Sequence, residues 1–351
     1  MNILVTGDQG YIGSVLTTML IEKSYNVRGY DTGYYQNCAI DAVNDSYLRI
    51  MKDIRDVSIE DLIDIDAVIH LAALSNDHLG ELAPRLTETI NLQGTIKLAQ
   101  LARQAGVKRF IHSSSQSMYG IARLDRELDE DKSEKKPITE YARTKWDAEC
   151  TLMKLSDDDF AVVCFRPSTV FGVSPRLRCD IVFNNLVASA YTTGKIEIKS
   201  DGTPWRPVVH VRDVANAYIA GLEAPKALVA AQAFNVGIVD GNYTVRDLAD
   251  AAQRGVKGST LTFTGEHGSD ARTYRISFEK ILRQLKDYYK PEWDLDKGAQ
   301  ELVAFFKKIN FTEEQFRGRS CNRLRQIDHL LKEKQIDSEL YWTKALQAAA
   351  S

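Results

Sequence analysis

Short apolar runs alternate with amphipathic stretches through the first half of the chain. The runs that are apolar enough for buried strands are residues 2–6, 26–30, 47–51, 67–71, 109–113 and 160–166. Helical spacing of apolar side chains covers residues 14–23, 84–105 and 139–155. Buried parallel strands are continuously apolar, and regular strand–helix alternation is typical of a doubly wound parallel sheet. The pattern therefore predicts an α/β fold.

The regular alternation of strand and helix patterns ends after Pro167. Glycine and proline interrupt the chain often up to Pro207, short strand-like runs return at 208–211 and 233–236, and the last 70 residues are mostly helical in pattern. We predict a Rossmann-type domain of residues 1–166, with returns near 208–238. Residues 167–207 and 239–351 are predicted to form a smaller C-terminal substrate-binding lobe with a helical end.

Three glycines stand between the first predicted strand and the first helix. Gly7, Gly10 and Gly13 have the spacing GxxGxxG. Such glycines let a backbone approach a pyrophosphate, which the free N–H groups of the helix N-terminus can bind. The intervening Gln9, Tyr11 and Ile12 are further candidates for cofactor contact. A glycine turn that binds no ligand is the alternative. The residues that end the neighbouring strands help to distinguish the two interpretations.

Two acidic residues end the next two predicted strands. Asp31 ends the second strand, where a carboxylate can accept hydrogen bonds from both hydroxyls of an adenosine ribose. It would repel a 2′-phosphate, which favours NAD over NADP. Asp53 and Ile54 come after the third strand, where an adenine contact is expected. A turn or capping role is the alternative for Asp31, and a simple turn is the alternative for Asp53.

Composition narrows the possible classes. The 351 residues are 44% hydrophobic with a net charge of −3 and no long basic run, which argues against a nucleic-acid surface. No apolar stretch is long enough to cross a membrane. The five cysteines are scattered and odd in number, which indicates a reducing compartment. Neither the cysteines nor the six histidines have the spacing of metal ligands, so no metal site is predicted. We expect a cytoplasmic protein.

The residue pair best suited to catalysis is Tyr141 and Lys145. Four positions apart on a helix, they share one face, and the ammonium would favour the phenolate and make Tyr141 a general base. Such pairs are also common on helix surfaces. Ser115 lies in a serine-rich loop after the fifth strand, where an open sheet places its ligands and where a hydroxyl could bind substrate. A merely polar loop is the alternative.

Taken in order, these features resemble one family. The segments TGDQGYIGS, VIHLAALS, INLQGT, SSSQSMYG, YARTK, FRPSTVFG and DGTPWRPVVHVRDVANA resemble the extended short-chain dehydrogenase/reductase family, and within it the nucleotide-sugar epimerases and dehydratases. The resemblance runs from about residue 1 to 278. It implies NAD as cofactor, a nucleotide-diphosphate sugar as substrate, and a homodimer joined by a four-helix bundle of the 84–105 and 139–155 helices.

The resemblance also implies roles for particular residues. Tyr141 resembles the family's base, Lys145 its electrostatic and ribose-binding partner, and Ser115 its hydrogen-bonding serine. Further cofactor contacts are implied at Leu71, Ala72, Ala73, Asn91, Ser113, Pro167 and Ser168. Substrate contacts are implied or expected at Ser75, Asn76, Gln116, Ser117, Thr169, Asn184, Asn185, Arg206 and Arg272. For the two arginines, which suit phosphate oxygens, an ordinary ion pair is the alternative.

The reaction is narrowed by the two residues after Ser115. The family's 4,6-dehydratases carry an Asp-Glu pair there, which eliminates water, whereas this chain has Gln116 and Ser117. An amide and a hydroxyl cannot replace an acid/base pair, so dehydration is disfavoured. We expect an NAD-dependent epimerase that oxidises its sugar transiently, with a reductase of a 4-keto-6-deoxy sugar as the runner-up. A non-catalytic dinucleotide sensor is less favoured because the Ser115, Tyr141 and Lys145 set is intact. Thr169, where many relatives carry an asparagine, places a standard UDP-galactose specificity in doubt.

Overall fold

A parallel sheet of seven strands organises the larger part of the molecule. The computed structural model describes residues 1–75, 83–121, 126–265 and 273–343. The strand order is β10-β6-β5-β4-β1-β2-β3, and every neighbouring pair is parallel. Its strands are β1 (Asn2–Thr6), β2 (Asn26–Asp31), β3 (Leu48–Met51), β4 (Ala67–His70), β5 (Arg109–Ser113), β6 (Ala161–Pro167) and β10 (Gln232–Val236). The predicted Rossmann-type sheet is confirmed.

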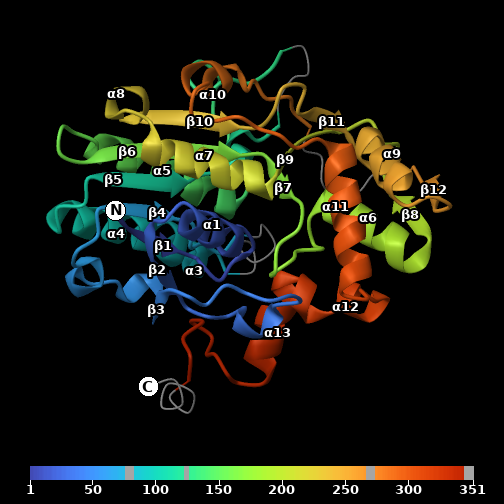
Figure 1. The fold of residues 1–351 in the computed structure, drawn as a ribbon, viewed down its shortest axis with the longest axis horizontal. Helices are drawn as coiled ribbons and strands as arrows, with labels where there is room; N and C mark the ends of the chain where they lie inside the picture. The colour runs from blue at the N-terminus through green and yellow to red at the C-terminus, as the bar shows by residue number, and fades with distance from the viewer. Residues whose placement is uncertain (76–82, 122–125, 266–272, 344–351) are drawn as a thin grey trace.

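Helices cover both faces of this sheet (Figure 1). One face carries α1 (Tyr11–Glu22) and α7 (Val211–Glu223), and the other carries α4 (Gly94–Gln104) and α5 (Glu140–Leu155). The predicted helix over 84–105 is one helical path made of α3 (Pro84–Thr87), a π-helical turn (Glu88–Gln93) and α4. Alternate strand residues separate the two cores: Ile3 and Val5 pack toward α1, and Leu4 packs toward α4.

The lobe beside the sheet is built from short strands and helices. Strands β7 (Thr169–Phe171), β9 (Trp205–His210) and β11 (Asn242–Thr244) form one small sheet, and β8 (Lys195–Ile198) pairs with β12 (Thr260–Phe263) in another. The lobe helices are α6 (Val182–Thr193), α9 (Val245–Gly255), α11 (Leu295–Lys308) and α12 (Glu313–Arg317). Two further helices, α8 (Lys226–Val229) and α10 (Glu279–Gln284), pack against the main sheet at β6 and β10, and α13 (Arg323–Lys332) follows α12. Single 3-10 turns cover Gln36–Cys38, Ile54–Asp56, Ile59–Leu62, Gln116–Tyr119 and Arg319–Cys321.

Two segments differ from the predicted division of the chain. Residues 208–210 belong to β9 in the small lobe sheet and not to the main sheet, because β9 pairs with β7 and β11. Helix α13 and the residues after it leave the lobe and pack beside β2 and β3 (Figure 1). Sequence pattern indicates that a segment is a strand or a helix, but not which partner buries it.

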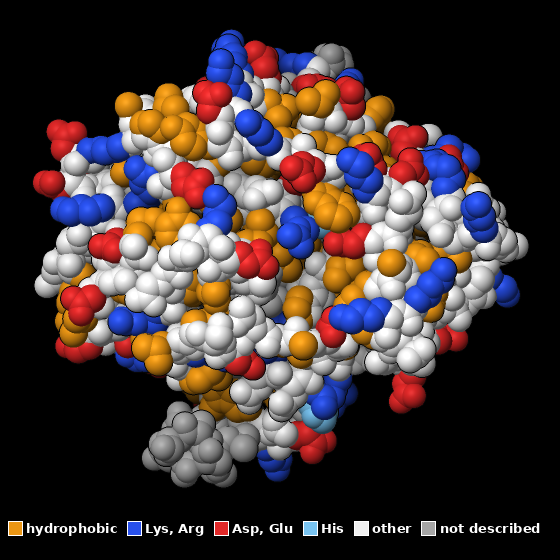
Figure 2. Space-filling model, viewed as in Figure 1, with side chains coloured by type: hydrophobic (Ala, Val, Ile, Leu, Met, Phe, Trp, Pro, Cys, Tyr) orange, Lys and Arg blue, Asp and Glu red, His pale blue; other side chains and the backbone are white. Residues whose placement is uncertain are grey.

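The surface charge and the described helices and side chains bear on which ligands and surroundings the protein is built for. Lysine and arginine are interspersed with acidic residues on the face in Figure 2, in keeping with the net charge of −3. Within the described ranges no helix is long and apolar enough to cross a membrane, and no group of three or more His, Cys, Asp or Glu side chains is placed to hold a metal ion.

Candidate active site

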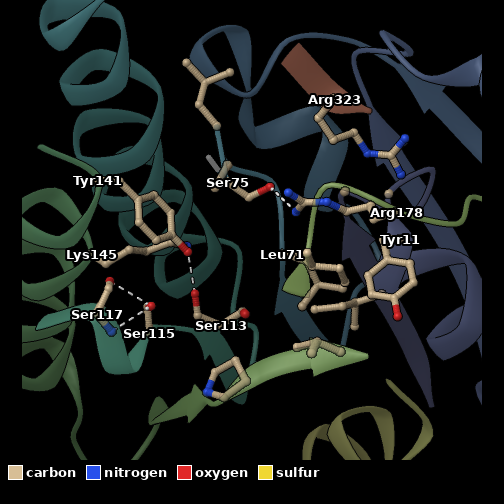
Figure 3. Close-up of a pocket in the computed structure, with 18 of the residues that line it drawn as sticks. Tyr11, Leu71, Ser75, Ser113, Ser115, Ser117, Tyr141, Lys145, Arg178 and Arg323 are labelled. Carbon is tan, nitrogen blue, oxygen red and sulfur yellow. Dashed lines mark hydrogen bonds between the residues drawn. The ribbon is translucent and has the colours of Figure 1, made fainter. Parts of the chain in front are cut away.

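A cavity of about 1240 Å³ lies between the carboxyl ends of the sheet strands and the lobe. The glycine turn, the ends of β2, β4, β5 and β6, and the first turns of α5 line it from the domain side. The loop before α6 and the start of α13 line it from the other side. In Figure 3, Tyr141 and Lys145 form one wall together with Ser113, Ser115 and Ser117, and Leu71, Tyr11 and Arg178 lie across the cavity from them.

The glycine turn is shaped for a close ligand. Gly7 has φ of +76°, and a Cβ there would lie 2.8 Å from the Ala72 nitrogen. A Cβ on Gly13 would lie 2.1 Å from the Gly7 carbonyl oxygen. Only glycine fits at these two positions, and the turn leaves the N-terminus of α1 facing the cavity, where a pyrophosphate would bind. Gly10, Tyr11, Ile12 and Gly13, which were predicted to contact the cofactor, line the cavity.

Gln9 lies apart from this group. It is buried, its amide contacts Met51 and Arg176, and it is not among the cavity-lining residues. Only its backbone N–H is directed to the site, where it donates to Asp31 at 3.1 Å. Its role is to position the acid, which sequence position alone does not reveal.

Asp31 is held in place at the end of β2. Its two oxygens accept from the N–H groups of Gly33, at 2.7 Å, and Gln9. Burial and the neighbouring charge of Asp8 raise the pKa of Asp31 to about 6, against the effect of these two N–H donors. Asp8 itself is buried and is bonded to Tyr47, at 2.8 Å, and to Arg49, at 2.7 Å. Asp8 lies within the glycine motif, but its effect on Asp31 was not predicted from the sequence.

The raised pKa of Asp31 predicts a pH-dependent affinity for NAD. An ionised carboxylate is the stronger acceptor for ribose hydroxyls, and protonation competes with it as pH falls through 6. The dissociation constant of NAD should therefore rise about tenfold between pH 7 and pH 5. Calorimetric titration at both pH values measures it. Asp8→Asn removes the neighbouring charge and should shift the transition to lower pH, while an affinity that is constant from pH 7 to 5 would contradict this role.

The predicted catalytic residues share one wall of the cavity. Thr139 caps α5, which places Tyr141 and Lys145 in the first turns of the helix. The buried Lys145 donates from Nζ to the carbonyl oxygen of Ser113 at 2.7 Å, and the ring of Tyr141 stands beside it (Figure 3). Burial lowers the pKa of Lys145 to about 8, so its ammonium is present at neutral pH and is lost above that value.

The serine loop faces Tyr141 from below in the same view. Ser115 Oγ lies 2.8 Å from Ser117 Oγ and accepts from the Ser117 N–H at 3.1 Å. Ser113 Oγ is bonded to Tyr218, so the Ser113 side chain is engaged in the core. Gln116 is buried and donates to the carbonyl oxygen of Arg166 at 3.0 Å. The cavity is also lined by all five residues from the end of β5 through the serine loop: Ser113, Ser114, Ser115, Gln116 and Ser117.

A loop after β4 forms the floor between the two halves of the site. Leu71, Ala72 and Ala73, predicted to contact the cofactor, line the cavity, and so does Ser75, predicted to contact the substrate. Asn91 does not line it: the buried amide accepts from the Leu74 N–H at 2.8 Å and donates to the Leu74 carbonyl at 3.1 Å. Asn91 therefore fixes the loop and does not reach the cofactor space directly.

The remaining predicted contacts divide into two groups. Asp53, Ile54, Pro167, Ser168, Thr169, Asn185 and Arg206 line the cavity. Asn184 does not: it is fully buried and bonds to Gly172, to Tyr11 and to the Arg178 carbonyl, so it supports the loop before α6. Helix geometry predicts that Asn184 and Asn185 point in different directions, but it does not show which of the two faces the cavity. Asn76 and Arg272 lie outside the described residues.

Several cavity residues carry no motif and were not predicted. Arg178 binds Asp180 with two hydrogen bonds, at 2.8 and 3.0 Å, and reaches Ser75 at 3.3 Å across the cavity (Figure 3). Thr32, Tyr34 and Tyr35 line the Asp31 end, and Asn322, Arg323 and Leu324 approach from the C-terminal part. The only advance signal was the charged run around Arg178 in a predicted lobe loop.

Comparison with known proteins agrees with this arrangement. Residues 3–237 match the model of the NAD dependent epimerase/dehydratase family, and the chain belongs to that family. It is 28% identical over 343 residues to a UDP-glucose 4-epimerase of Bacillus subtilis, covering 87% of this chain and 95% of the relative. A human dTDP-D-glucose 4,6-dehydratase is 29% identical over 246 residues, 67% of this chain and 68% of the relative.

A solved structure extends the likeness to the fold. The UDP-glucuronic acid 4-epimerase from Bacillus cereus, in complex with UDP-glucuronic acid and NAD, superposes with a TM-score of 0.74 at 25% identity, covering 88% of this chain and all of the other. The protein is thus an NAD-dependent enzyme of the extended short-chain dehydrogenase/reductase type, and NAD is its cofactor. The glycine cradle and Asp31 fit that cofactor.

Proposed function

We propose that the protein is an epimerase of a nucleotide-diphosphate sugar. The observation that carries this proposal is the placement of Tyr141, Lys145 and Ser115 on one wall of a cavity that continues to the glycine turn and Asp31. A base, a cation and a hydroxyl donor are thus placed beside the space for a dinucleotide. The cavity of about 1240 Å³ is large enough for a cofactor and a second elongated ligand.

The proposed mechanism assigns one task to each residue. The glycine turn and Asp31 would hold NAD, which would supply the hydride chemistry at the sugar carbon. The Lys145 ammonium, held by the Ser113 carbonyl, favours the phenolate form of Tyr141. This phenolate removes the hydroxyl proton at that carbon, and the resulting phenol later gives the proton back. Ser115 binds the oxygen that becomes a ketone. Because the hydride is returned to the other face, the sugar is inverted and no external reductant is consumed.

Dehydration is disfavoured by the two residues after Ser115. The Gln116 amide donates to a backbone carbonyl in the buried layer, and Ser117 is bonded to Ser115. Neither group can exchange a proton with the carbons of the sugar as a carboxylate pair does. Similarity to UDP-sugar 4-epimerases supports inversion at C4. Asn185, Thr169 and Arg206 line the part of the cavity nearest the lobe, where we place the sugar and diphosphate.

The proposal is tested with a panel of nucleotide sugars. Thermal stabilisation by UDP, dTDP, GDP and CDP forms identifies the base, and proton NMR then monitors the sugar. We expect inversion at C4 with bound NAD and no change in nicotinamide absorbance. Stoichiometric loss of NADH with a keto sugar would instead identify a reductase, and a loss of water would identify a dehydratase.

We also propose a cytoplasmic homodimer. The five cysteines are free, as expected in a reducing compartment. The π-helical turn Glu88–Gln93 packs against α5, so the two helices proposed for a four-helix bundle already form one unit in the protomer. Light scattering behind gel filtration should give twice the chain mass of 39.5 kDa. A monomer at micromolar concentration would contradict the dimer and leave the active-site assignment unaffected.

A further inference from the structure

The C-terminal segment of residues 322–343 crosses from the lobe back to the NAD-binding domain. Helix α13 and the residues after it lie beside β2 and β3 at the lower edge of the molecule in Figure 1. Ile327, Leu330, Ile336 and Leu340 are at most 5% exposed and share the core that contains Tyr34. The segment is therefore an integral part of this domain and is held there by burial of apolar side chains.

The beginning of the segment forms part of the cavity wall. Asn322, Arg323 and Leu324 line the same cavity as Asp31. The Arg323 guanidinium lies 4.3 Å from the centre of the Tyr35 ring and donates to the Arg176 carbonyl at 2.9 Å. The chain after α12 thus closes the cavity at the end where the adenosine of NAD is expected.

The end of the segment holds the loop after β2. Trp342 donates from Nε1 to the Thr32 carbonyl at 2.5 Å, and the Tyr34 hydroxyl donates to the Leu340 carbonyl. Gln326 on α13 donates to the Tyr34 carbonyl at 2.8 Å. Thr32 and Tyr34 both line the cavity close after Asp31.

The same segment also holds the loop after β3. Arg55 donates to the Glu339 carbonyl at 2.9 Å, and its guanidinium lies 3.8 Å from the centre of the Tyr341 ring. Arg55 in turn pairs with Asp53 at 2.8 Å, and Asp53 lines the cavity. One segment therefore fastens both loops that are predicted to enclose the adenosine.

We propose that residues 322–343 act as a clasp that retains NAD in the site. Release of the adenosine requires the loops after β2 and β3 to separate, and the clasp holds both. The proposal deepens the proposed function, since an enzyme that returns its own hydride must keep the reduced cofactor until the keto sugar has turned over. Trp342 and Tyr341 are positioning residues, because they act through the loops and not on the cofactor.

The double variant Trp342→Ala/Tyr341→Ala tests the clasp. The variant loses the Trp342 hydrogen bond to Thr32, the Tyr341 ring contact with Arg55, and the Trp342 ring contact with Tyr34, whose ring centres are 6.1 Å apart. These losses should speed NADH release about tenfold, measured by the fluorescence of NADH displaced by excess NAD. Turnover at saturating NAD should change less than twofold, because the catalytic wall is untouched. Leu331→Ala is the matched control: it lies on α13, is 37% exposed, and should release NADH at the wild-type rate.

A milder variant tests the clasp even if the double variant does not fold. Trp342→Phe keeps the ring in place but removes the N–H donor, and we expect a release rate between those of the wild type and the double variant. Unchanged NADH release in both folded variants, or loss of turnover at saturating NAD without faster release, would overturn the clasp. Wild-type protein that retains NAD but inverts no sugar would overturn the proposed function alone, because the release assay contains no sugar.

Discussion

Tyr141→Phe should lower the turnover number at least a thousandfold, the upper part of the range for loss of a positioned general base. Phenylalanine keeps the ring beside Lys145 but has no hydroxyl to take the proton from the sugar. The dissociation constant of NAD should change less than about threefold, because the glycine turn and Asp31 are unaffected. Steady-state kinetics and calorimetric titration of NAD measure both quantities.

A conservative control exists for this substitution. Tyr288→Phe removes the same hydroxyl from a residue that is 36% exposed and is not among the cavity-lining residues, and it should leave turnover unchanged. Ser115→Ala should cost less than Tyr141→Phe, since Ser115 binds the oxygen but does not take its proton. Turnover that survives Tyr141→Phe within tenfold would contradict the assignment of the base.

Arg166→Met should lower the free energy of unfolding by about 3–5 kcal/mol, the cost of leaving a buried charge without its partner. Arg166 on β6 pairs with Glu149 on α5, and their side chains are 3% and 2% exposed. Glu149 also accepts from Ser114 at 2.6 Å, and Gln116 donates to the Arg166 backbone. The pair thus anchors the serine loop to the helix that carries Tyr141. Urea unfolding measures the loss, and turnover should fall with it.

The double substitution Arg166→Met/Glu149→Leu separates charge from packing. With both charges removed, no unpaired ion remains at this pair, and we expect most of the lost stability to return. Turnover should stay low in the double variant, because Ser114 has lost its acceptor. A single substitution that costs less than about 1 kcal/mol would show that the pair does not support the site in this way.

The parts of the molecule that depend on local rules were predicted from sequence. The strands of the main sheet and the helices over 84–105 and 139–155 have strong periodicity, and the structure confirms them. The glycine turn was predictable because Gly7 and Gly13 have a steric reason to be there. Tyr141 and Lys145 were predictable as neighbours because helix geometry alone places positions four apart on one face.

The parts that depend on remote contacts were not predictable in this way. Asn91, Asn184 and Gln9 were expected at the ligand, yet their amides satisfy backbone or core groups, and only tertiary packing determines the direction in which a polar side chain points. The return of α13 to the domain depends on apolar residues meeting a core formed much earlier in the chain. No local period indicates such a partner.

Tyr141 and NAD are proposed to invert the sugar through transient oxidation at one carbon. The most direct measurement uses the stabilising nucleotide sugar with deuterium at C4, and then mass and NMR analysis of the product. We expect a C4 epimer that retains the deuterium, formed with no net change in NADH. A product that has lost the deuterium from C4, has lost water, or has formed with stoichiometric consumption of NADH would contradict it.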